Sequence, residues 1–315
     1  MNQSLKIIFL LLFCTTASAQ IDWEKYEPIV NYNDSNPEKL ARSITANFES
    51  EGEKVQAIYY WVTHNIAYDM KLYEKMKKSK GDKKKYSSKE AKEIERKEVA
   101  KTLKRHKGVC QQYSRVFQSL CQGIGIQCEF IGGYGKANPE KSGLGGKHAW
   151  NAVYLDGNWF LVDATFSAGY VDEKKKFHFS FDPSYFFSDP DAFKLNHLPK
   201  QSKWQLTEEL IDKNTYKNAP GIGAGYFKHK LGMLLPNSFK LSIEKGVPLV
   251  LSFTSQENLD DLYVSSLRKP RELTTEYAQE GDRYTISVNT DELKSGSYGF
   301  YQGKDLLFVY RLSVN

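Results

Sequence analysis

The strongest constraint on the fold is a strand–turn–strand pattern at residues 147–166. Residues 147–155 and 158–166 are rich in β-branched and aromatic side chains. The dipeptide Asp156-Gly157 between them is a strong signal for a tight hairpin turn. A two-residue turn fixes the register of the hairpin, because Leu155 must then face Asn158. The sequence therefore predicts an antiparallel strand pair of known register.

This register brings an imidazole and a carboxylate together. Asp163 falls opposite Trp150, and His148 lies on the same face as Trp150 because side chains alternate along a strand. His148 and Asp163 are therefore predicted to be diagonal neighbours, whereas a three-residue loop would turn Asp163 to the other face. A carboxylate beside an imidazole fixes its tautomer and supports its charged form.

A candidate nucleophile precedes the hairpin. Cys110 follows the turn residue Gly108, and apolar residues then recur at helical spacing: Val116, Phe117, Leu120 and Ile124. Cys110 is thus predicted at a helix N-terminus, where free N–H groups and the helix dipole favour a thiolate. A single cysteine before a helix is also typical of a small buried apolar residue. With His148 and Asp163 nearby, we favour the nucleophile, with the Cys110 N–H as an oxyanion donor.

The length and the pattern along the chain indicate two domains after a leader. The chain has 315 residues, 40% of them apolar, which is room for about two domains. Helices are expected over residues 37–48, 51–66 and 88–105. Beyond residue 230, short β-type runs separated by turn residues are typical of a small antiparallel sandwich. The expected division is a catalytic domain over residues 20–206, a linker over 207–230 and a β-sandwich over 231–315.

The net charge of +6 is concentrated in one segment. Residues 71–107 hold 16 Lys or Arg against 6 Asp or Glu, so they carry +10 and the remainder carries −4. This distribution argues against a nucleic-acid-binding protein. Within it, residues 71–88 have little apolar content and are expected to be a solvated, mobile insertion; the alternative is a contact surface for an anionic partner.

The first 19 residues resemble a signal peptide. Lys6 precedes a short apolar run, and small residues follow up to Ala17-Ser18-Ala19, an A-x-A cleavage pattern. The run is too short to span a bilayer. We expect cleavage after Ala19 and an exported protein, periplasmic or extracellular, without an integral membrane segment.

Three cysteines remain after that cleavage. Cys121 and Cys128 either form a bridge or are both buried thiols, and the second interpretation is preferred. Either way Cys110 is left over. The spacing of the three matches no zinc-ligand pattern, so no metal and no cofactor is predicted.

Three motifs in order resemble the transglutaminase-like superfamily of papain-like fold, in particular its kyphoscoliosis peptidase-type branch. They are Gly108-Val109-Cys110-Gln111-Gln112-Tyr113, His148-Ala149-Trp150-Asn151 and Leu161-Val162-Asp163-Ala164-Thr165. The helix at 58–69 and the tail from Tyr185 through His197-Leu198-Pro199 to Leu206 are similar as well. The resemblance covers roughly residues 40–206.

The resemblance implies an α+β catalytic core, with N-terminal helices packed on an antiparallel sheet, followed by an immunoglobulin-like sandwich. It also implies a catalytic triad of Cys110, His148 and Asp163. The chain departs from the family pattern at two positions. Gln112 stands where a small residue is usual and is expected to narrow the mouth beside Cys110, and Phe166 replaces a common tryptophan.

The expected function is cysteine-dependent acyl transfer at a peptide or amide bond of a protein or peptide substrate. Water as acceptor makes the protein a peptidase or amidase, which we favour because nothing marks an amine or calcium site. A lysine amine as acceptor makes it a cross-linking transglutaminase. The third alternative is a non-catalytic scaffold on the same fold. The glycine-rich loop at residues 136–147, directly before His148, is a candidate lid. The sequence does not indicate the oligomeric state or the substrate.

Overall fold

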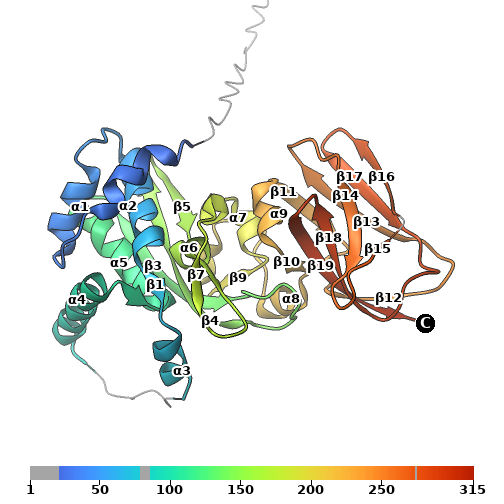
Figure 1. The fold of residues 1–315 in the computed structure, drawn as a ribbon, viewed down its shortest axis with the longest axis horizontal. Helices are drawn as coiled ribbons and strands as arrows, with labels where there is room; N and C mark the ends of the chain where they lie inside the picture. The colour runs from blue at the N-terminus through green and yellow to red at the C-terminus, as the bar shows by residue number, and fades with distance from the viewer. Residues whose placement is uncertain (1–20, 79–85, 274) are drawn as a thin grey trace, which may run out of the picture.

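The computed structural model describes residues 21–78, 86–273 and 275–315. The predicted signal peptide, residues 1–19, lies outside this range. The elements form an N-terminal domain of helices and one central sheet, followed by a domain of strands (Figure 1). Across the described part of the chain, no helix combines the length and the apolar character needed to cross a membrane.

The predicted N-terminal helices are confirmed. They are α1 (Pro37–Thr45), α2 (Glu51–Asn65) and α4 (Ser88–Arg105), after a 3-10 helix η1 (Glu24–Asn31). Polar caps fix where each of the three α-helices begins, because a side-chain oxygen accepts a free N–H of the first turn: Asn36 for α1, Ser50 for α2 and Ser87 for α4. The helix α5 (Cys110–Gly123) also begins where it was expected.

The central sheet has the strand order β8-β5-β4-β3-β9 and is antiparallel throughout. Its strands are β3 (Cys128–Gly135), β4 (Gly146–Leu155), β5 (Asn158–Val162), β8 (Phe186–Ser188) and β9 (His197–Pro199). Leu155 pairs with Asn158 and Asn151 with Val162, which confirms the predicted register. The turn suits its residues, since both Asp156 and Gly157 have positive φ values of 48° and 84°.

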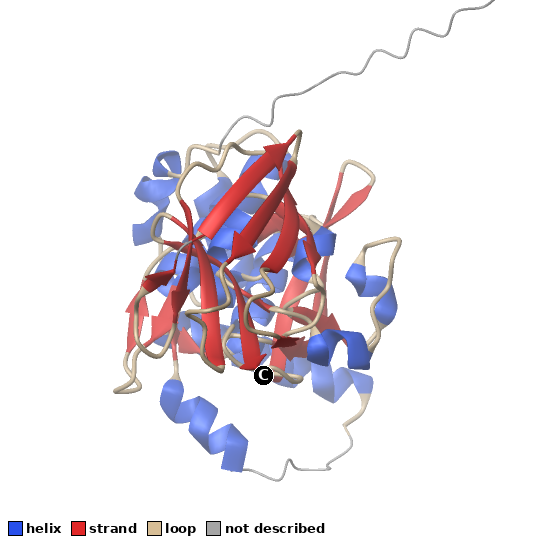
Figure 2. Ribbon diagram, turned by 90° about the vertical axis from the view of Figure 1, so that its right-hand side faces the viewer, coloured by secondary structure: helices blue, strands red, loops and turns tan. Residues whose placement is uncertain are grey.

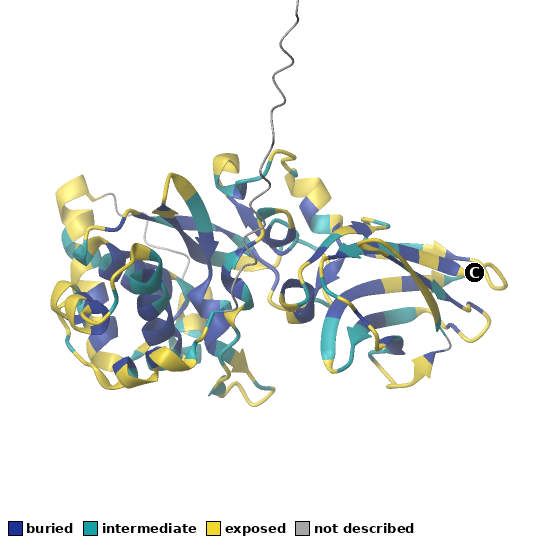
Figure 3. Cartoon of the chain, turned by 90° about the horizontal axis from the view of Figure 1, so that it is seen from above, coloured by how far each residue is buried: buried dark blue, intermediate teal, exposed yellow. Residues whose placement is uncertain are grey.

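Each face of the central sheet packs against a different core. One face, with Val153 and Val162, packs against α1, α2 and α5. The other face, with Trp150, Ala152 and Leu161, shares a continuous apolar core with the C-terminal strands. Buried segments therefore run through both domains, and exposed segments gather in the outer helices and loops (Figure 3).

The C-terminal strands form two sheets, which face the viewer in Figure 2. One has the order β11-β13-β17-β16, and the other has β10-β19-β18-β14-β15 with β12 parallel to β19. These orders correspond to the two sheets of an immunoglobulin-like sandwich, so the predicted α+β architecture with an all-β C-terminal domain is confirmed. The strands are β10 (Gly221–Ile222), β11 (Leu231–Leu235), β12 (Lys240–Ile243), β13 (Leu249–Ser255), β14 (Leu262–Ser266), β15 (Glu272–Leu273), β16 (Thr275–Glu280), β17 (Arg283–Val288), β18 (Gly296–Gln302) and β19 (Asp305–Val314).

The structure differs from the expected linker at 207–230. These residues form α8 (Lys213–Asn218), β10 and α9 (Ala224–Lys228). β10 pairs with β19, so the segment is part of the sandwich. The composition of this segment, rich in Asn, Gly and Lys, is typical of a loop. β10 gives no strand signal in the sequence, because it has only two residues and its partner strand β19 lies at the other end of the domain.

Part of the expected mobile insertion is helical. Residues Met70–Lys78 form α3, and residues 79–85 lie outside the described part of the chain. α3 begins where the Leu72 N–H donates to the Asp69 carboxylate at 2.9 Å. The remaining short elements of the N-terminal domain are β1 (Ala67–Tyr68), β2 (Lys107–Gly108), α6 (Ala164–Ala168), β6 (Gly169–Val171), β7 (Phe177–Phe179), η2 (Pro183–Tyr185), α7 (Pro190–Phe193) and η3 (Ser202–Gln205).

Candidate active site

Cys110 is the first residue of α5, and it is partly exposed. The turn before it is held by Gln112, whose Oε1 accepts a hydrogen bond from the Val109 N–H at 3.2 Å. A glycine is required at position 108, because a Cβ there would lie 2.5 Å from the Gln112 Cβ. The N–H groups of Cys110 and Gln111 have no acceptor among the described residues. The start of α5 therefore presents free donors beside the thiol.

The expectation that Gln112 narrows the mouth beside Cys110 is wrong. Each residue of an α-helix turns by about 100°, so residues two apart point in nearly opposite directions. Gln112 faces α4, where it lines a hollow of about 250 Å³ together with Val99 and Arg115. Access to Cys110 is thus not restricted by this side chain.

His148 and Asp163 are in direct contact, as the hairpin register predicts. His148 Nε2 lies 2.5 Å from Asp163 Oδ2. Only 7% and 1% of the two side chains are exposed, so solvent does not screen the pair. β5 ends at Val162, so Asp163 is the first residue after the strand. It caps α6 instead of continuing β5 as expected.

The capping role fixes the Asp163 carboxylate. Its Oδ1 accepts the N–H groups of Thr165 at 2.8 Å and Phe166 at 3.1 Å. The Phe166 ring then stacks on the His148 imidazole, with centroids 4.4 Å apart. The short helix α6, which the sequence pattern assigned to a strand, therefore holds both the carboxylate and an apolar cover over the imidazole.

The electrostatics of the pair favour an imidazolium. Burial disfavours the charge on His148, but the Asp163 carboxylate and the charge at Cys110 outweigh it and raise the pKa of His148 to about 10. Burial also opposes the charge on Asp163, yet the neighbouring imidazoles hold the pKa of Asp163 well below its ordinary value. Because Nε2 of His148 is bonded to Asp163, Nδ1 is the nitrogen left to interact with Cys110, whose charge contributes to the raised pKa of His148.

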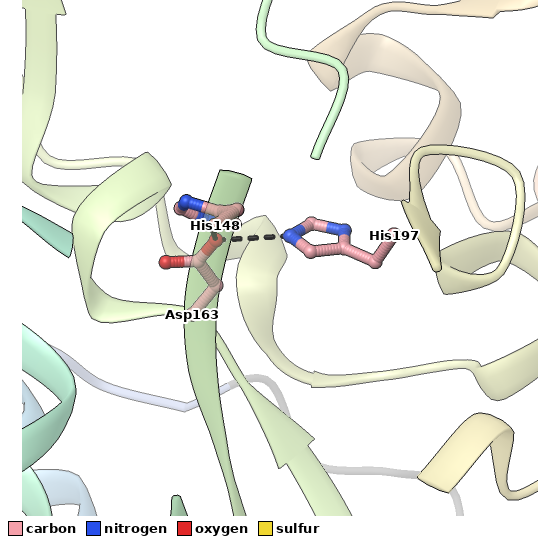
Figure 4. Close-up of side chains that lie close together, drawn as sticks. All are labelled: His148, Asp163 and His197. Carbon is pink, nitrogen blue, oxygen red and sulfur yellow. Dashed lines mark hydrogen bonds and ion pairs between the residues drawn. The ribbon is translucent and has the colours of Figure 1, made fainter. Parts of the chain in front are cut away.

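A second imidazole, which the sequence analysis did not assign to the site, contacts the same carboxylate. His197 Nε2 lies 2.9 Å from Asp163 Oδ2, and the His197 side chain has no exposed surface. Figure 4 shows the two imidazoles on either side of the carboxylate. Burial lowers the pKa of His197 to about 4, so this ring is neutral at physiological pH. Position 197 follows the hairpin by more than 30 residues, and no local pattern links it to the site.

Tyr68 is a further polar side chain beside Cys110. β1 and β2 pair in parallel with Tyr68 opposite Gly108, two residues before the cysteine. Burial raises the pKa of Tyr68 well above its ordinary value, and the negative charge at Cys110 adds to the shift. The phenol therefore keeps its proton.

The buried trio of His148, Asp163 and His197 is the group in the described residues with the composition of a metal site. Its geometry fits direct hydrogen bonds better than a metal ion. Ligands of a zinc ion each lie about 2.0–2.2 Å from the metal and are therefore more than about 3 Å from one another. The nitrogen–oxygen distances of 2.5 and 2.9 Å leave no room for an ion between them.

The loop at 136–147, expected as a lid, is attached to the sandwich domain. The buried Lys136 Nζ donates to the carbonyl groups of Tyr216 at 2.5 Å and Ala219 at 3.3 Å. The Gly143 N–H donates to the Lys217 carbonyl at 2.9 Å. These bonds join the loop to the end of α8, where a lysine suits the free carbonyl groups of a helix C-terminus. The loop is therefore anchored at its first residue, Lys136, and again at Gly143.

The other two cysteines are buried free thiols, as preferred from the sequence. Cys121 and Cys128 are at most 1% exposed and contact each other. Burial and the neighbouring thiol raise the pKa of Cys128 well above its ordinary value. Cys110 is therefore the accessible thiol among the described cysteines.

Comparisons with known proteins agree with this part of the fold. Residues 38–164 match the pattern of the transglutaminase-like superfamily. The kyphoscoliosis peptidase of Mus musculus is 31% identical over 188 residues, which is 58% of this chain and 26% of that protein. The protein of the same name from Homo sapiens is 30% identical over 213 residues, 64% of this chain and 30% of that protein. The chain thus spans less than a third of the length of these relatives.

A solved structure described as a TGase overlaps with 51% of this chain and 37% of its own, at 21% identity and a TM-score of 0.32. The matched range of the superfamily pattern runs from α1 to the start of α6 and contains Cys110, His148 and Asp163. Residues 38–164 are therefore similar to the transglutaminase-like superfamily, and a longer part of the chain is similar to the kyphoscoliosis peptidases.

Proposed function

We propose that this protein is a cysteine-dependent acyl-transfer enzyme that cleaves peptide or amide bonds. The observation that carries the proposal is the buried contact of His148 with Asp163, together with a Cys110 thiol near enough to act on the pKa of His148. A thiol at a helix N-terminus, beside an imidazole that a buried carboxylate orients, is the arrangement of an activated cysteine nucleophile.

The first half of the reaction forms a thioester. The Cys110 sulfur attacks the carbonyl carbon of the substrate, and the carbonyl oxygen gains negative charge. The free N–H groups of Cys110 and Gln111 and the Tyr68 hydroxyl are the donors available to that oxygen. His148 then gives its proton to the leaving nitrogen, the C–N bond breaks, and an amine departs.

The second half releases the acyl group. Water gives its proton to the neutral His148 and attacks the thioester carbon, and the Cys110 thiolate leaves with the product acid as the other fragment. If a lysine amine takes the place of water, the product is a new amide bond. We favour hydrolysis, because water is always available and nothing in the sequence marks an amine site or a calcium site.

The test uses glutamine-containing peptides and unfolded protein substrates with the full chain. Mass spectrometry distinguishes cleavage, gain of water at an amide with loss of ammonia, and incorporation of an added primary amine. We expect cleavage or deamidation that is absent from Cys110→Ser and reduced by about 10²–10⁴ in His148→Gln. Turnover that persists in Cys110→Ser would contradict the proposal, and lack of any turnover in the wild type would favour the scaffold alternative.

A destination for the protein is proposed from the sequence of residues 1–19 alone. We propose export to the periplasm or the exterior, which a cell fractionation and the N-terminal sequence of the recovered protein would test. A mature protein that begins at Gln20 is the expected result, and retention of Met1 would contradict export.

A further inference from the structure

The Asp163 carboxylate has four hydrogen-bond donors. The two backbone N–H groups of α6 occupy Oδ1, and the two imidazoles occupy Oδ2. A carboxylate offers about four lone-pair sites, so every site is filled. Two of the four donors are side chains, His148 and His197. His148 is the acid and base of the proposed reaction, whereas His197 takes no part in its proton transfers.

His197 is held rigidly where its Nε2 faces the carboxylate. It lies on β9 and pairs with Gly135 of β3. Its ring stacks on Phe193 with centroids 3.8 Å apart and planes at 13°, and the Trp150 ring packs edge-on at 5.0 Å. An imidazole fixed in this way on two aromatic rings cannot turn away from Asp163 without disturbing the core.

His197 is a neutral hydrogen-bond donor, so it does not compete with His148 for the negative charge of Asp163. The ionisable groups that face the ring are Asp163, His148 and Tyr185. A second imidazolium here would neutralise Asp163 and weaken its effect on His148. A neutral ring that donates from Nε2 fills the second lone pair of Oδ2 and leaves the negative charge in place.

The other ring nitrogen also has a suitable neighbour. His197 Nδ1 lies 2.6 Å from the Asn196 side chain, whose amide is placed with Oδ1 toward the ring. The oxygen and nitrogen of such an amide exchange places when the group is flipped. A neutral ring that donates from Nε2 must accept at Nδ1, and the Asn196 amide, turned so that its NH₂ group faces the ring, supplies that donor. The amide oxygen then faces the Tyr185 hydroxyl, 3.5 Å from the amide.

We propose that His197 is a positioning residue, a fixed neutral donor that holds the Asp163 carboxylate in line with the His148 N–H. The inference rests on the proposed function, since it concerns the same thiol–imidazole pair. Without this donor, Oδ2 of a buried carboxylate has an unfilled site in an apolar pocket, and His148 is the one remaining group that holds Oδ2 in place. The imidazolium form of His148, and with it the Cys110 thiolate, then loses stability.

The experiment measures the rate of Cys110 alkylation by iodoacetamide as a function of pH in the folded full chain. Cys121 and Cys128 are buried, and Cys14 is replaced by Ser in every protein, so the signal comes from Cys110. The variants are His197→Phe, which keeps a flat ring without a donor, and His197→Gln, whose amide nitrogen can donate near the position of Nε2. The matched control is His178→Phe, because His178 also contacts a carboxylate, Asp172, at 2.8 Å but lies elsewhere on a hairpin.

We expect reactivity of the wild type to persist well below the ordinary thiol pKa of about 8.5. His197→Phe is expected to lose about 10-fold of the rate near pH 6, with its acid limb moved up by about one unit, in the range found when groups that orient a functional imidazole are removed. His197→Gln is expected to stay within about 3-fold of the wild type, and His178→Phe to leave the profile unchanged.

Three results would overturn the inference. A His197→Phe profile equal to that of the wild type would show that His197 does not position Asp163. The proposed function would not be affected by that result. Equal losses in the Phe and Gln variants would show that packing, not the donor, matters. A wild type that reacts as an ordinary thiol would overturn the proposed function and this inference with it. If His197→Phe fails to fold, His197→Asn replaces it, since its shorter amide does not reach Asp163.

Discussion

Two histidine–carboxylate pairs in this protein have nearly the same geometry and different surroundings. His148 contacts Asp163 at 2.5 Å in the candidate site, and His178 contacts Asp172 at 2.8 Å on the β6–β7 hairpin. Both bonds join Nε2 to a carboxylate Oδ2, and both carboxylates also accept backbone N–H groups. The exposed fractions are 7% and 1% in the first pair and 36% and 29% in the second.

The comparison teaches that burial, more than contact geometry, gives the first pair its chemical character. In the interior, little water screens the attraction between imidazolium and carboxylate, so each charge depends on the other. On the hairpin, solvent screens the same attraction. A thiol beside the buried pair meets an imidazolium that keeps its proton at neutral pH.

The largest difference is expected when each carboxylate is replaced by an amide. Asp163→Asn leaves a buried imidazole without its anionic partner and should lower the free energy of unfolding by about 3–5 kcal/mol. Asp172→Asn should lower it by less than about 1 kcal/mol. Urea unfolding of both variants at neutral pH measures the difference. Equal losses would show that burial does not separate the two pairs.

A second difference is expected in the dependence of stability on pH. The pKa of His148 is raised to about 10 in the folded chain, so its contribution is complete below its unfolded pKa of about 6.5 and is lost as the pH rises through about 10. Relative to His148→Gln, the wild type should therefore lose a few kcal/mol between about pH 7 and pH 11.

The control for this titration is His178→Gln, which should follow the wild-type curve over the same range. Urea midpoints at a series of pH values provide the measurement. Asp163 has the opposite dependence on pH, because its pKa is lower in the folded chain than in the unfolded chain. Its contribution to stability is complete above its unfolded pKa and is lost as the pH falls through its folded pKa. A difference between wild type and His148→Gln that does not vary with alkaline pH would contradict the raised pKa.

The sequence was sufficient to predict the first pair because its contact is local. A two-residue turn sets the register, and side-chain alternation then places His148 diagonal to Asp163. The sequence was not sufficient for His197, which reaches the carboxylate through the pairing of β9 with β3. Long-range strand pairing leaves no periodic signal in a single sequence.

The same reasoning explains the errors in the fold. The strand expected to run through Phe166 ends at Val162, because the Asp163 side chain caps a helix there. The segment expected as a linker contains β10, whose partner β19 is more than 80 residues away. Gln112 was assigned to the mouth of the site from its position in a motif, whereas helix geometry turns it toward α4.

A third difference concerns the aromatic ring that covers each imidazole. Phe166 stacks on His148 at 4.4 Å, and Tyr170 stacks on His178 at 5.3 Å. Phe166→Ala should admit water to the buried pair, lower the pKa of His148 toward its ordinary value and cost about 1–3 kcal/mol of stability. Tyr170→Ala, at a ring that is 58% exposed, should change stability by less than about 0.5 kcal/mol.

The measurements for this pair of variants are urea unfolding and the NMR titration of the imidazole protons. A His148 titration midpoint that is unchanged in Phe166→Ala would show that Asp163 alone maintains the raised pKa. In that case the Phe166 ring would contribute packing but would not affect the pKa of His148. The difference between the two pairs would then come from the burial of Asp163 compared with the exposure of Asp172.

The smallest effect is expected at Gln112, which lies two residues from Cys110 in sequence but faces α4 and not the buried pair. Gln112→Ala removes the hydrogen bond to the Val109 N–H and should cost about 0.5–1.5 kcal/mol of stability. The exposed neighbour Gln111 is the matched control, and Gln111→Ala should stay within about 0.5 kcal/mol of the wild type. Neither change alters the surroundings of His148, so the alkylation profile of Cys110 should keep its midpoint in both. A midpoint that moves in Gln112→Ala alone would show that the turn before α5, and not only the buried pair, determines the reactivity of the thiol.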